Sequence, residues 1–123
     1  MLPVTRSLVV KATAGADSPE RCAQAFTVAA AGCAAGVATS LWLTGDSVWL
    51  ALPGRAQAFE LEFAPDLAQL LDLLLADGTV TVCTQCAARR GITAADVLPG
   101  VRIAGASAFV AEALSEGAQA LVY

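Results

Sequence analysis

Short apolar runs rich in β-branched residues alternate along the chain with longer segments whose apolar residues recur at helical spacing. A continuous apolar run of about four to eight residues is typical of a strand that is buried on both faces of a parallel sheet. We therefore expect a strand at each short run: SLVVKAT (7–13), VATSLWLTGD (37–46), TVTVC (79–83), VRIAG (101–105) and AQALVY (118–123).

The segments between these runs carry helix signals. Ser18 followed by Pro19 matches an N-cap with proline in the first turn, so a helix is predicted over 20–35, with Gly36 as its end. Its alanine-rich sequence, with Gly32 inside, would let a neighbouring element approach closely. Further helices are predicted over 64–78, where leucines recur at helical spacing, over one turn at 86–91, over 93–100 with Pro99 as the end, and over 107–117.

The segment between the second strand and the leucine-rich helix is less regular. DSVWLAL (46–52) fits a short helix capped by Asp46, which we favour, or an extended piece. PGRAQ (53–57) is predicted to be a turn. FELEF (59–63) alternates apolar and acidic residues at period two, which is typical of a strand.

Strands that alternate with helices through short Gly, Ser and Asp turns indicate βαβ units. The sequence thus predicts an α/β fold with a parallel sheet and helices on both faces. Because soluble domains commonly contain about 100–200 residues, a chain of 123 residues fits a single domain over 1–123.

Composition adds a tendency to self-association. Hydrophobic residues make up 57% of the chain and charged residues 15%, compared with about 45–50% and 25% in average proteins. Little surface is then left for solvation, and we expect subunit interfaces.

The apolar excess does not predict a membrane protein. The longest poorly charged stretch, 22–43, is rich in alanine and glycine and contains Gln24 and Ser40, whereas a transmembrane helix needs about 20 strongly apolar residues. The N-terminal apolar run is broken by Lys11 and has no long apolar core before a small-residue cleavage site. We expect a cytoplasmic protein without membrane contact.

Charge and residue types exclude several functions. The formal net charge is −4, and of the seven basic residues only Arg89 and Arg90 are adjacent, so no basic stripe could neutralise phosphates and direct nucleic-acid binding is not expected. The sequence contains no histidine, which removes the usual general base and the commonest metal ligand. Any chemistry must use thiols, carboxylates or backbone groups.

The strongest candidate site is the segment TVTVCTQCAARRGI, where Cys83 ends a predicted strand and Cys86 follows it. In parallel α/β sheets, ligands bind beyond the carboxyl ends of the strands. A helix that starts at about Thr84 would direct backbone N–H groups at the Cys83 sulfur, and Arg89 or Arg90 could add positive charge. Both effects lower the pKa of a thiol and favour the nucleophilic thiolate.

Other interpretations of the cysteines stay open. Structural zinc needs four ligands, and Cys22 and Cys33 lie apart on a predicted helix, so we expect no metal and no other cofactor. A CxxC pair at a helix start could form a disulfide, although its late position in the chain argues against a thioredoxin. All four cysteines could instead be small buried hydrophobes, which is the interpretation that we favour for Cys22 and Cys33.

Over nearly its whole length, the chain resembles the DsrE/DsrF-like family of small sulfur-relay and sulfur-oxidation proteins. The segments SPERCAQAFTVAAAG, LWLTGDSVWLAL and GVRIAGASAFVAEAL contribute to the resemblance, and VCTQCAARRGI is its most specific part. The resemblance implies a doubly wound, three-layer α/β/α fold with a mainly parallel five-stranded sheet. It also implies assembly into a homotrimer or homohexamer.

In the relay branch of that family, a cysteine six residues before Arg-Arg-Gly accepts sulfane sulfur as a persulfide and passes it to a partner protein. Cys83 has this spacing to Arg89. The resemblance implies that Cys83 is the nucleophile and that Cys86 resolves the persulfide or holds Cys83 in place. Arg89 or Arg90 would stabilise the anionic sulfur, or would be a solvated charge or an interface ion pair.

Three functions follow from these observations. The first is a sulfur carrier that works through a Cys83 persulfide and has a sulfur donor or acceptor protein as its partner. The second is a thiol–disulfide or reactive-sulfur-sensing module that uses Cys83 and Cys86. The third is a non-catalytic oligomeric domain that binds a small ligand at the strand ends. A nucleotide site is disfavoured, because KATAGADSPE lacks the glycine-rich phosphate-binding patterns.

Overall fold

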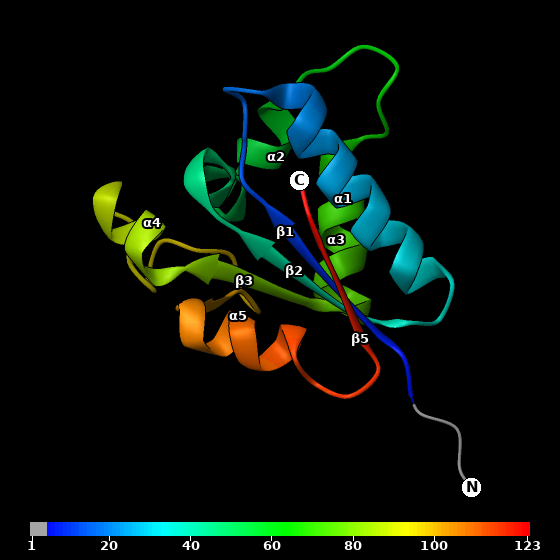
Figure 1. Cartoon of the computed structure of the whole chain (residues 1–123). Coiled ribbons are helices and arrows are strands. Elements are labelled where there is room, and N and C mark those ends of the chain that lie inside the picture. The colour runs from blue at the N-terminus through cyan, green and yellow to red at the C-terminus, as the bar shows by residue number, and fades with distance from the viewer. Residues whose placement is uncertain (1–4) are drawn as a thin grey trace, which may run out of the picture.

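The protein contains one sheet of five strands in the order β4-β3-β2-β1-β5, as seen in a computed structural model that describes residues 5–123 (Figure 1). All four neighbouring pairs are parallel, so the sheet is entirely parallel. Each strand lies within the segment that was predicted for it. The strands are β1 (Ser7–Ala12), β2 (Ala38–Leu43), β3 (Thr79–Cys83), β4 (Arg102–Ala104) and β5 (Ala118–Val122).

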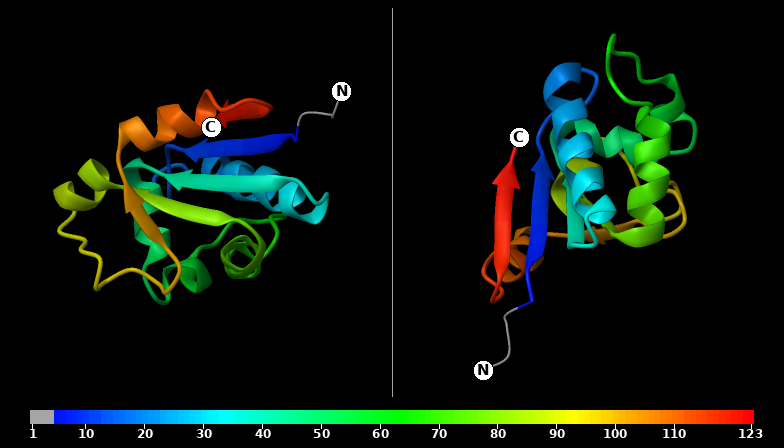
Figure 2. Two further views of the ribbon diagram at one scale, coloured as in Figure 1. Left: turned by 90° about the horizontal axis from the view of Figure 1, so that it is seen from below. Right: turned by 90° about the vertical axis from the view of Figure 1, so that its right-hand side faces the viewer.

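Helices cover both faces of the sheet, which confirms the predicted doubly wound α/β fold. Helices α1 (Pro19–Ala34) and α3 (Leu67–Asp77) pack on one face, and α5 (Ala106–Ala113) lies on the other (Figure 2). The chain crosses from β4 at one edge to β5 at the other edge through α5. The short elements are the 3-10 helix η1 (Gly45–Ala51), α2 (Arg55–Ala58) and α4 (Thr84–Arg89).

The main hydrophobic core lies between the sheet and the helices α1 and α3. Because side chains of a strand alternate between its two faces, every second residue of the central strands enters this core. The buried residues from both layers include Val10, Leu41, Leu43, Val80, Val82, Phe26, Leu71 and Leu74. The opposite face is different, since α5 contains no fully buried side chain.

Gly32 brings α1 close to the sheet, as its place in the alanine-rich segment predicts. A Cβ atom at this position would lie 2.7 Å from Thr39 Oγ1 and 2.8 Å from Leu8 Cδ2. The helix begins at Pro19, with Ser18 at the N-cap position but without a side-chain capping hydrogen bond. Gly36 follows the end of the helix with a φ of 78°.

The helix predicted over 93–100 is wrong. The Asp96 carboxylate accepts hydrogen bonds from the Thr93 backbone N–H at 2.7 Å and from the Thr93 hydroxyl at 2.9 Å, which closes a turn instead. The Leu98 backbone N–H then donates to the Ala51 carbonyl oxygen at 2.8 Å. These bonds tie the segment to η1 and leave no regular helical ladder.

The strand pattern over 59–63 is also not realised. This segment is a loop between α2 and α3, and it ends at Phe63, which is fully exposed and has a φ of 59°. A positive φ interrupts an extended chain. The predicted turn at 53–57 contains Gly54 with a φ of 80° and continues into the one-turn helix α2.

The favoured helix over 46–52 is present as the 3-10 helix η1, but its N-cap residue is Thr44 and not Asp46. None of the helices in the part of the chain that the structure describes has the length and apolar content that a membrane span requires. The start of the N-terminal segment examined for a leader, residues 1–4, lies outside the described residues.

Candidate functional site

Cys83 is the last residue of β3 and the N-cap residue of α4. It lines a crevice of about 320 Å³ at the carboxyl ends of the strands, where ligand sites of parallel sheets lie. Three strands, the start of α4 and the start of α5 contribute to this crevice. Its lining residues are Lys11, Trp42, Thr44, Cys83, Thr84, Gln85, Gly105 and Ala106.

The surroundings of Cys83 favour its thiolate. Burial opposes ionisation, but hydrogen bonds from the backbone N–H and thiol of Cys86, a hydrogen bond from the Gln85 N–H and the charge of Lys11 together outweigh it. The pKa of the Cys83 thiol is therefore below its ordinary value. A thiolate is the form of cysteine that attacks electrophilic sulfur.

Cys86 occupies a different environment and does not line the crevice. The Gly45 backbone N–H donates to Cys86 Sγ at 3.3 Å, and the Cys86 side chain packs against the hydrophobic core. Cys83 and Cys86 are both free thiols. The pair is therefore a reduced dithiol in which Cys86 supports Cys83 by hydrogen bonding.

The two arginines of the motif contact Cys86 and η1. Arg90 Nη2 lies 2.7 Å from Asp46 Oδ1, and Arg90 Nη1 donates to the Cys86 carbonyl oxygen at 3.0 Å. Arg89 is exposed, with its Nη1 at 3.9 Å from Cys86 Sγ. Arg90 thus anchors α4 through an ion pair within the chain, and not through the interface ion pair that the sequence left open.

The charge that contributes to the lowered pKa of Cys83 is that of Lys11, whereas the sequence suggested that Arg89 or Arg90 could add positive charge there. Lys11 lies near the carboxyl end of β1, in register with Trp42 of β2. The sequence does contain a signal for it, because a lysine within the apolar run SLVVKAT breaks the pattern of a buried strand. Trp42, Thr44 and Gly105 carry no comparable signal.

Cys22 and Cys33 lie away from this crevice, on α1. Burial, with a contribution from the charge of Asp17, raises the pKa of Cys22 to about 12. Cys33 is half-buried and packs against the core. Both positions agree with a packing role. Among residues 5–123, no group of three or more Cys, Asp or Glu side chains is placed to hold a metal ion.

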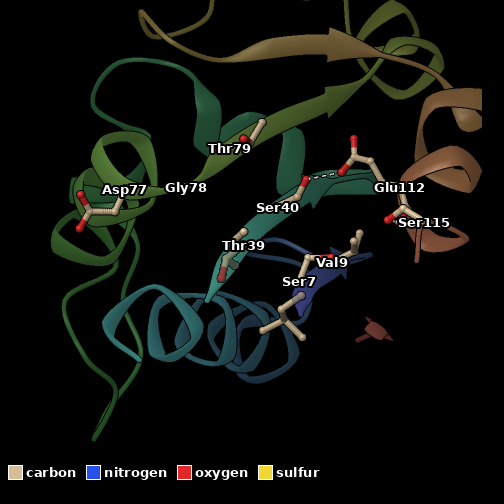
Figure 3. A pocket seen from close by; sticks show the side chains of 11 residues that line it. Ser7, Val9, Thr39, Ser40, Asp77, Gly78, Thr79, Glu112 and Ser115 are labelled. Atoms are coloured by element: carbon tan, nitrogen blue, oxygen red, sulfur yellow. Dashed lines mark hydrogen bonds between the residues drawn. The ribbon is translucent and has the colours of Figure 1, made fainter. Parts of the chain in front are cut away.

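A second hollow, of about 270 Å³, lies at the amino ends of β1, β2 and β3, at the opposite end of the sheet from Cys83 (Figure 3). Glu112 of α5 reaches into it and accepts hydrogen bonds from Ser40 Oγ at 2.5 Å and from Trp42 Nε1 at 3.1 Å. Arg102 forms an ion pair with the other carboxylate oxygen. The Glu112 carboxylate is therefore engaged in holding α5 on the sheet.

The model of the DsrE/DsrF-like family matches residues 6–123 of the chain. The chain belongs to the DsrE/DsrF-like family. This confirms the resemblance that the cysteine segment carries. No curated protein matched the sequence.

Solved structures similar to this DsrE/DsrF-like chain support the same fold. The ychN protein from E. coli shares 22% identity with a TM-score of 0.79, covering 96% of this chain and 99% of that one. MTH1491 from Methanobacterium thermoautotrophicum, a protein of unknown function, shares 12% identity with a TM-score of 0.72, covering 96% and 99%. BT1422 from Bacteroides thetaiotaomicron, also of unknown function, shares 16% with a TM-score of 0.63, covering 95% and 94%.

Within this family fold, the site combines three chemical elements. Cys83 provides a nucleophilic sulfur and Lys11 a positive charge in the crevice itself, and Cys86, which does not line the crevice, provides a second thiol one helical turn further along α4. Such a set can exchange sulfur–sulfur bonds, because thiolates attack disulfides and persulfides without a metal or a general base.

Proposed function

We propose that the protein is a sulfur carrier that accepts sulfane sulfur on Cys83 as a persulfide and passes it on. The observation that carries this proposal is the position of Cys83, a thiol with a lowered pKa at a strand end, in the wall of an open crevice. Membership of the DsrE/DsrF-like family supports it.

The transfer is an exchange of sulfur–sulfur bonds. The Cys83 thiolate attacks the outer sulfur of a donor persulfide R–S–SH, a new S–S bond forms, and the donor leaves as the thiolate R–S⁻. The proton stays on the transferred sulfur, so Cys83 becomes Cys83–S–SH. An acceptor thiolate then attacks this outer sulfur, takes it and releases the Cys83 thiolate. Neither step needs an external oxidant or reductant.

A second candidate function uses both thiols of the pair. The contribution of Cys86 to the lowered pKa of Cys83 favours it, because it places the second thiol near the first at the start of α4. In this reaction a Cys86 thiolate attacks the inner sulfur of the Cys83 persulfide, which forms the Cys83–Cys86 disulfide and releases HS⁻. The protein would then act as a thiol–disulfide or reactive-sulfur-sensing module.

Mass spectrometry that resolves each cysteine separates these functions. We expect a persulfide donor to add sulfur to Cys83 in the wild type, and to add none at that position in Cys83→Ser. In Cys86→Ser, a carrier should still pass its sulfur to an acceptor thiol such as a cysteine peptide. A sensing module should instead keep the sulfur on Cys83 and lose the disulfide.

Absence of added sulfur on all cysteines would contradict both functions. If Cys83 then also alkylated no faster than Cys33, a half-buried cysteine outside the crevice, the remaining function would be that of an oligomeric ligand-binding domain. Cys22 is less suitable as the reference, since its burial alone makes it slow.

We also propose that the chain assembles as a homotrimer or homohexamer and works in the cytoplasm, where thiols stay reduced. Four large apolar side chains are exposed in the described chain, Phe63, Val110, Leu114 and Val122, and these support an interface. Sedimentation analysis should give a mass of three or six chains. A monomer at micromolar concentration would contradict the proposed assembly. Recovery of the protein from an oxidising compartment would contradict the proposed location.

A further inference from the structure

Lys11 is a charged residue that the fold holds in place inside the crevice. It lies on β1, where it pairs with Trp42 of β2 on one side and with Val122 of β5 on the other. The backbone of Lys11 is therefore held between two neighbouring strands. Its ammonium group is 5.0 Å from the centre of the Phe109 ring of α5. Phe109 in turn makes an edge-to-face contact with Trp42, with ring centres 5.5 Å apart.

The charge of Lys11 is not neutralised by a carboxylate. The ion pairs among residues 5–123 are Arg90–Asp46 and Arg102–Glu112, and neither involves Lys11. A half-buried ammonium group that contacts an aromatic ring but no carboxylate keeps its field available to whatever enters the crevice. Cys83 lines the same crevice.

The proposed sulfur transfer creates a need for such a cation. Persulfides and polysulfides are anions near neutral pH, and the attacking Cys83 group is also an anion. Two negative charges that must come within bonding distance repel each other, unless a positive charge lies beside both of them.

We propose that Lys11 admits the sulfur donor to Cys83 as an anion: its ammonium group binds the negative charge of a persulfide or polysulfide in the crevice while the thiolate attacks. This inference rests on the proposed carrier function and names the substrate class of that site. The donor is a sulfane-sulfur anion, either free or carried on the cysteine of another protein.

The step balances for both donors. When the Cys83 thiolate attacks the outer sulfur of a persulfide anion R–S–S⁻, the products are Cys83–S–S⁻ and the thiolate R–S⁻, and the total charge is −2 on both sides. A free hydropolysulfide reacts in a corresponding way. The Cys83 thiolate attacks its protonated terminal sulfur, and a bond forms between that sulfur and Cys83 Sγ. The bond from the terminal sulfur to the rest of the chain breaks, and its electron pair leaves with the shortened polysulfide dianion. The product is Cys83–S–SH, and the total charge is −2 on both sides. Lys11 offsets this charge while the two anions are in contact.

The crevice has room for this donor. Its volume of about 320 Å³ is on the order of ten times the ~30 Å³ that one water molecule occupies in the liquid. A chain of a few sulfur atoms, or the end of a persulfidated side chain, fits in such a space.

Two alkylating reagents of similar size test the charge of the crevice without any sulfur transfer. Iodoacetate is an anion and iodoacetamide is neutral, and both react with the same thiolate, so the ratio of their rates at Cys83 cancels a change in thiolate fraction. We expect Lys11→Met to lower this ratio about fivefold and Lys11→Arg to preserve it. The matched control is Arg21→Met, which removes an exposed cation from α1 on the other face of the sheet.

If Lys11→Met slows both reagents equally, or slows neither, the ratio of the two rates is unchanged and the inference is overturned. Added salt provides a check on the wild type alone, which needs no variant to fold: screening should lower the iodoacetate rate more than the iodoacetamide rate. A ratio that does not respond to salt would also count against it.

Two sulfur donors then distinguish the sources. Sodium tetrasulfide represents the free anion, and a persulfidated cysteine peptide represents a protein-borne donor. For each protein, the rate at which Cys83 gains sulfur is divided by the rate at which iodoacetamide alkylates Cys83. This ratio should be lower in Lys11→Met than in the wild type. A lower loading rate with tetrasulfide identifies the free anion as the donor, and a lower rate with the peptide alone identifies a protein-borne donor. An unchanged loading rate with both donors overturns the inference. If the wild type accepts no sulfur, the carrier function and this role of Lys11 both fail, whereas the alkylation ratio still shows whether Lys11 selects anions.

Discussion

Arg90, the residue that follows α4, and Asp46 in η1 form an ion pair in which two guanidinium nitrogens share one carboxylate oxygen, at 2.7 Å and 3.1 Å. Arg90 also donates to the Cys86 carbonyl oxygen. The helix that carries Cys86 has only six residues, which is too short to be stable by itself. The Arg90–Asp46 pair therefore fixes α4 against the rest of the fold.

Removing this anchor should loosen α4 more than it weakens the whole fold. The Arg90 and Asp46 side chains are partly exposed, so Arg90→Met should lower the free energy of unfolding by about 1 kcal/mol. We expect alkylation of Cys86 to become severalfold faster, because its helix opens more often. Urea denaturation and cysteine-resolved alkylation measure the two effects.

Arg89→Met serves as the control, since Arg89 makes one weak contact and its loss should change stability by less than about 0.5 kcal/mol. Equal Cys86 reactivity in Arg90→Met and Arg89→Met would show that the ion pair does not hold the helix.

The lowered pKa of Cys83 predicts its reactivity at neutral pH. Its alkylation by iodoacetamide should follow the thiolate fraction, with a midpoint below that of a cysteine peptide, whose pKa is about 8.5. Lys11→Met should move the midpoint upward, because one of the contributions that lower the pKa is lost. The measurement is the alkylation rate of Cys83 from pH 5 to 10. A midpoint at or above that of the peptide would contradict this prediction.

Cys22 and Cys83 should make the free energy of unfolding change with pH in opposite directions. The native pKa of Cys83 is lowered, so its contribution rises as pH increases from that pKa to about 8.5 and is lost as pH falls through it. Burial raises the pKa of Cys22 to about 12, so its contribution is complete below about pH 8.5 and is lost as pH rises from there towards 12.

Replacing the buried thiol isolates the second effect. In Cys22→Ala, the alkaline decrease in unfolding free energy should become smaller, although the variant is less stable at pH 7 because a buried side chain is shortened. Urea denaturation at pH 7 and pH 9.5 measures the difference. The same alkaline decrease in wild type and variant would mean that Cys22 does not titrate on unfolding.

Much of the fold could be predicted from local sequence signals. The five strands follow from apolar runs, and α1 from Ser18–Pro19 and Gly36, because burial and backbone conformation act over a few residues. The errors come from contacts that the local pattern does not contain. The helix predicted over 93–100 failed because the Asp96 side chain closes a turn with Thr93 and because Leu98 is bonded to Ala51, far away in the sequence. The segment 59–63, which alternates apolar and acidic residues, pairs with no strand of the sheet and ends at Phe63 with a positive φ.

The site was predictable only in part, for a similar reason. The position of Cys83 at a strand end follows from the sequence. The origin of its positive charge does not, because Lys11 is 72 positions away and is brought there by the register of β1, β2 and β3. Arg90 looked suitable from its spacing, but it points towards Asp46, a residue whose position only the folded chain defines.

The close approach of α1 to the sheet predicts an unusual effect of Gly32→Ala. Alanine stabilises an isolated helix by about 1 kcal/mol relative to glycine. Here the added methyl group would meet Thr39 Oγ1 and Leu8 Cδ2 at less than 3.0 Å, and such overpacking costs about 1–3 kcal/mol. We expect a net loss of about 1 kcal/mol by urea denaturation. A more stable variant would show that the helix can shift at no cost, and Ala31→Ser, at an exposed position of the same helix, should be nearly neutral.

Glu112 should connect the stability of α5 with the reactivity of Cys83. Its carboxylate accepts hydrogen bonds from Ser40 and Trp42 and pairs with Arg102. Trp42 also lines the Cys83 crevice, and the residues before α5 complete its wall. Because α5 has no fully buried side chain, this network is a main attachment of the helix.

Glu112→Gln keeps the shape of the side chain but removes its charge, and should lower the unfolding free energy by about 1–2 kcal/mol at pH 7. Burial opposes ionisation of Glu112, but the hydrogen bonds from Ser40, Arg102 and Trp42 and the charge of Arg102 outweigh it and lower its pKa. The stabilisation is complete above an ordinary glutamate pKa of about 4.3 and is lost as pH falls through the native pKa. The stability difference between variant and wild type should therefore disappear at acidic pH.

We also expect Cys83 to be alkylated at a different rate in Glu112→Gln, because the start of α5 forms part of the crevice wall and would be held less firmly on the sheet. A constant difference from pH 7 to pH 3, with Cys83 unaffected, would mean that α5 is held by other contacts.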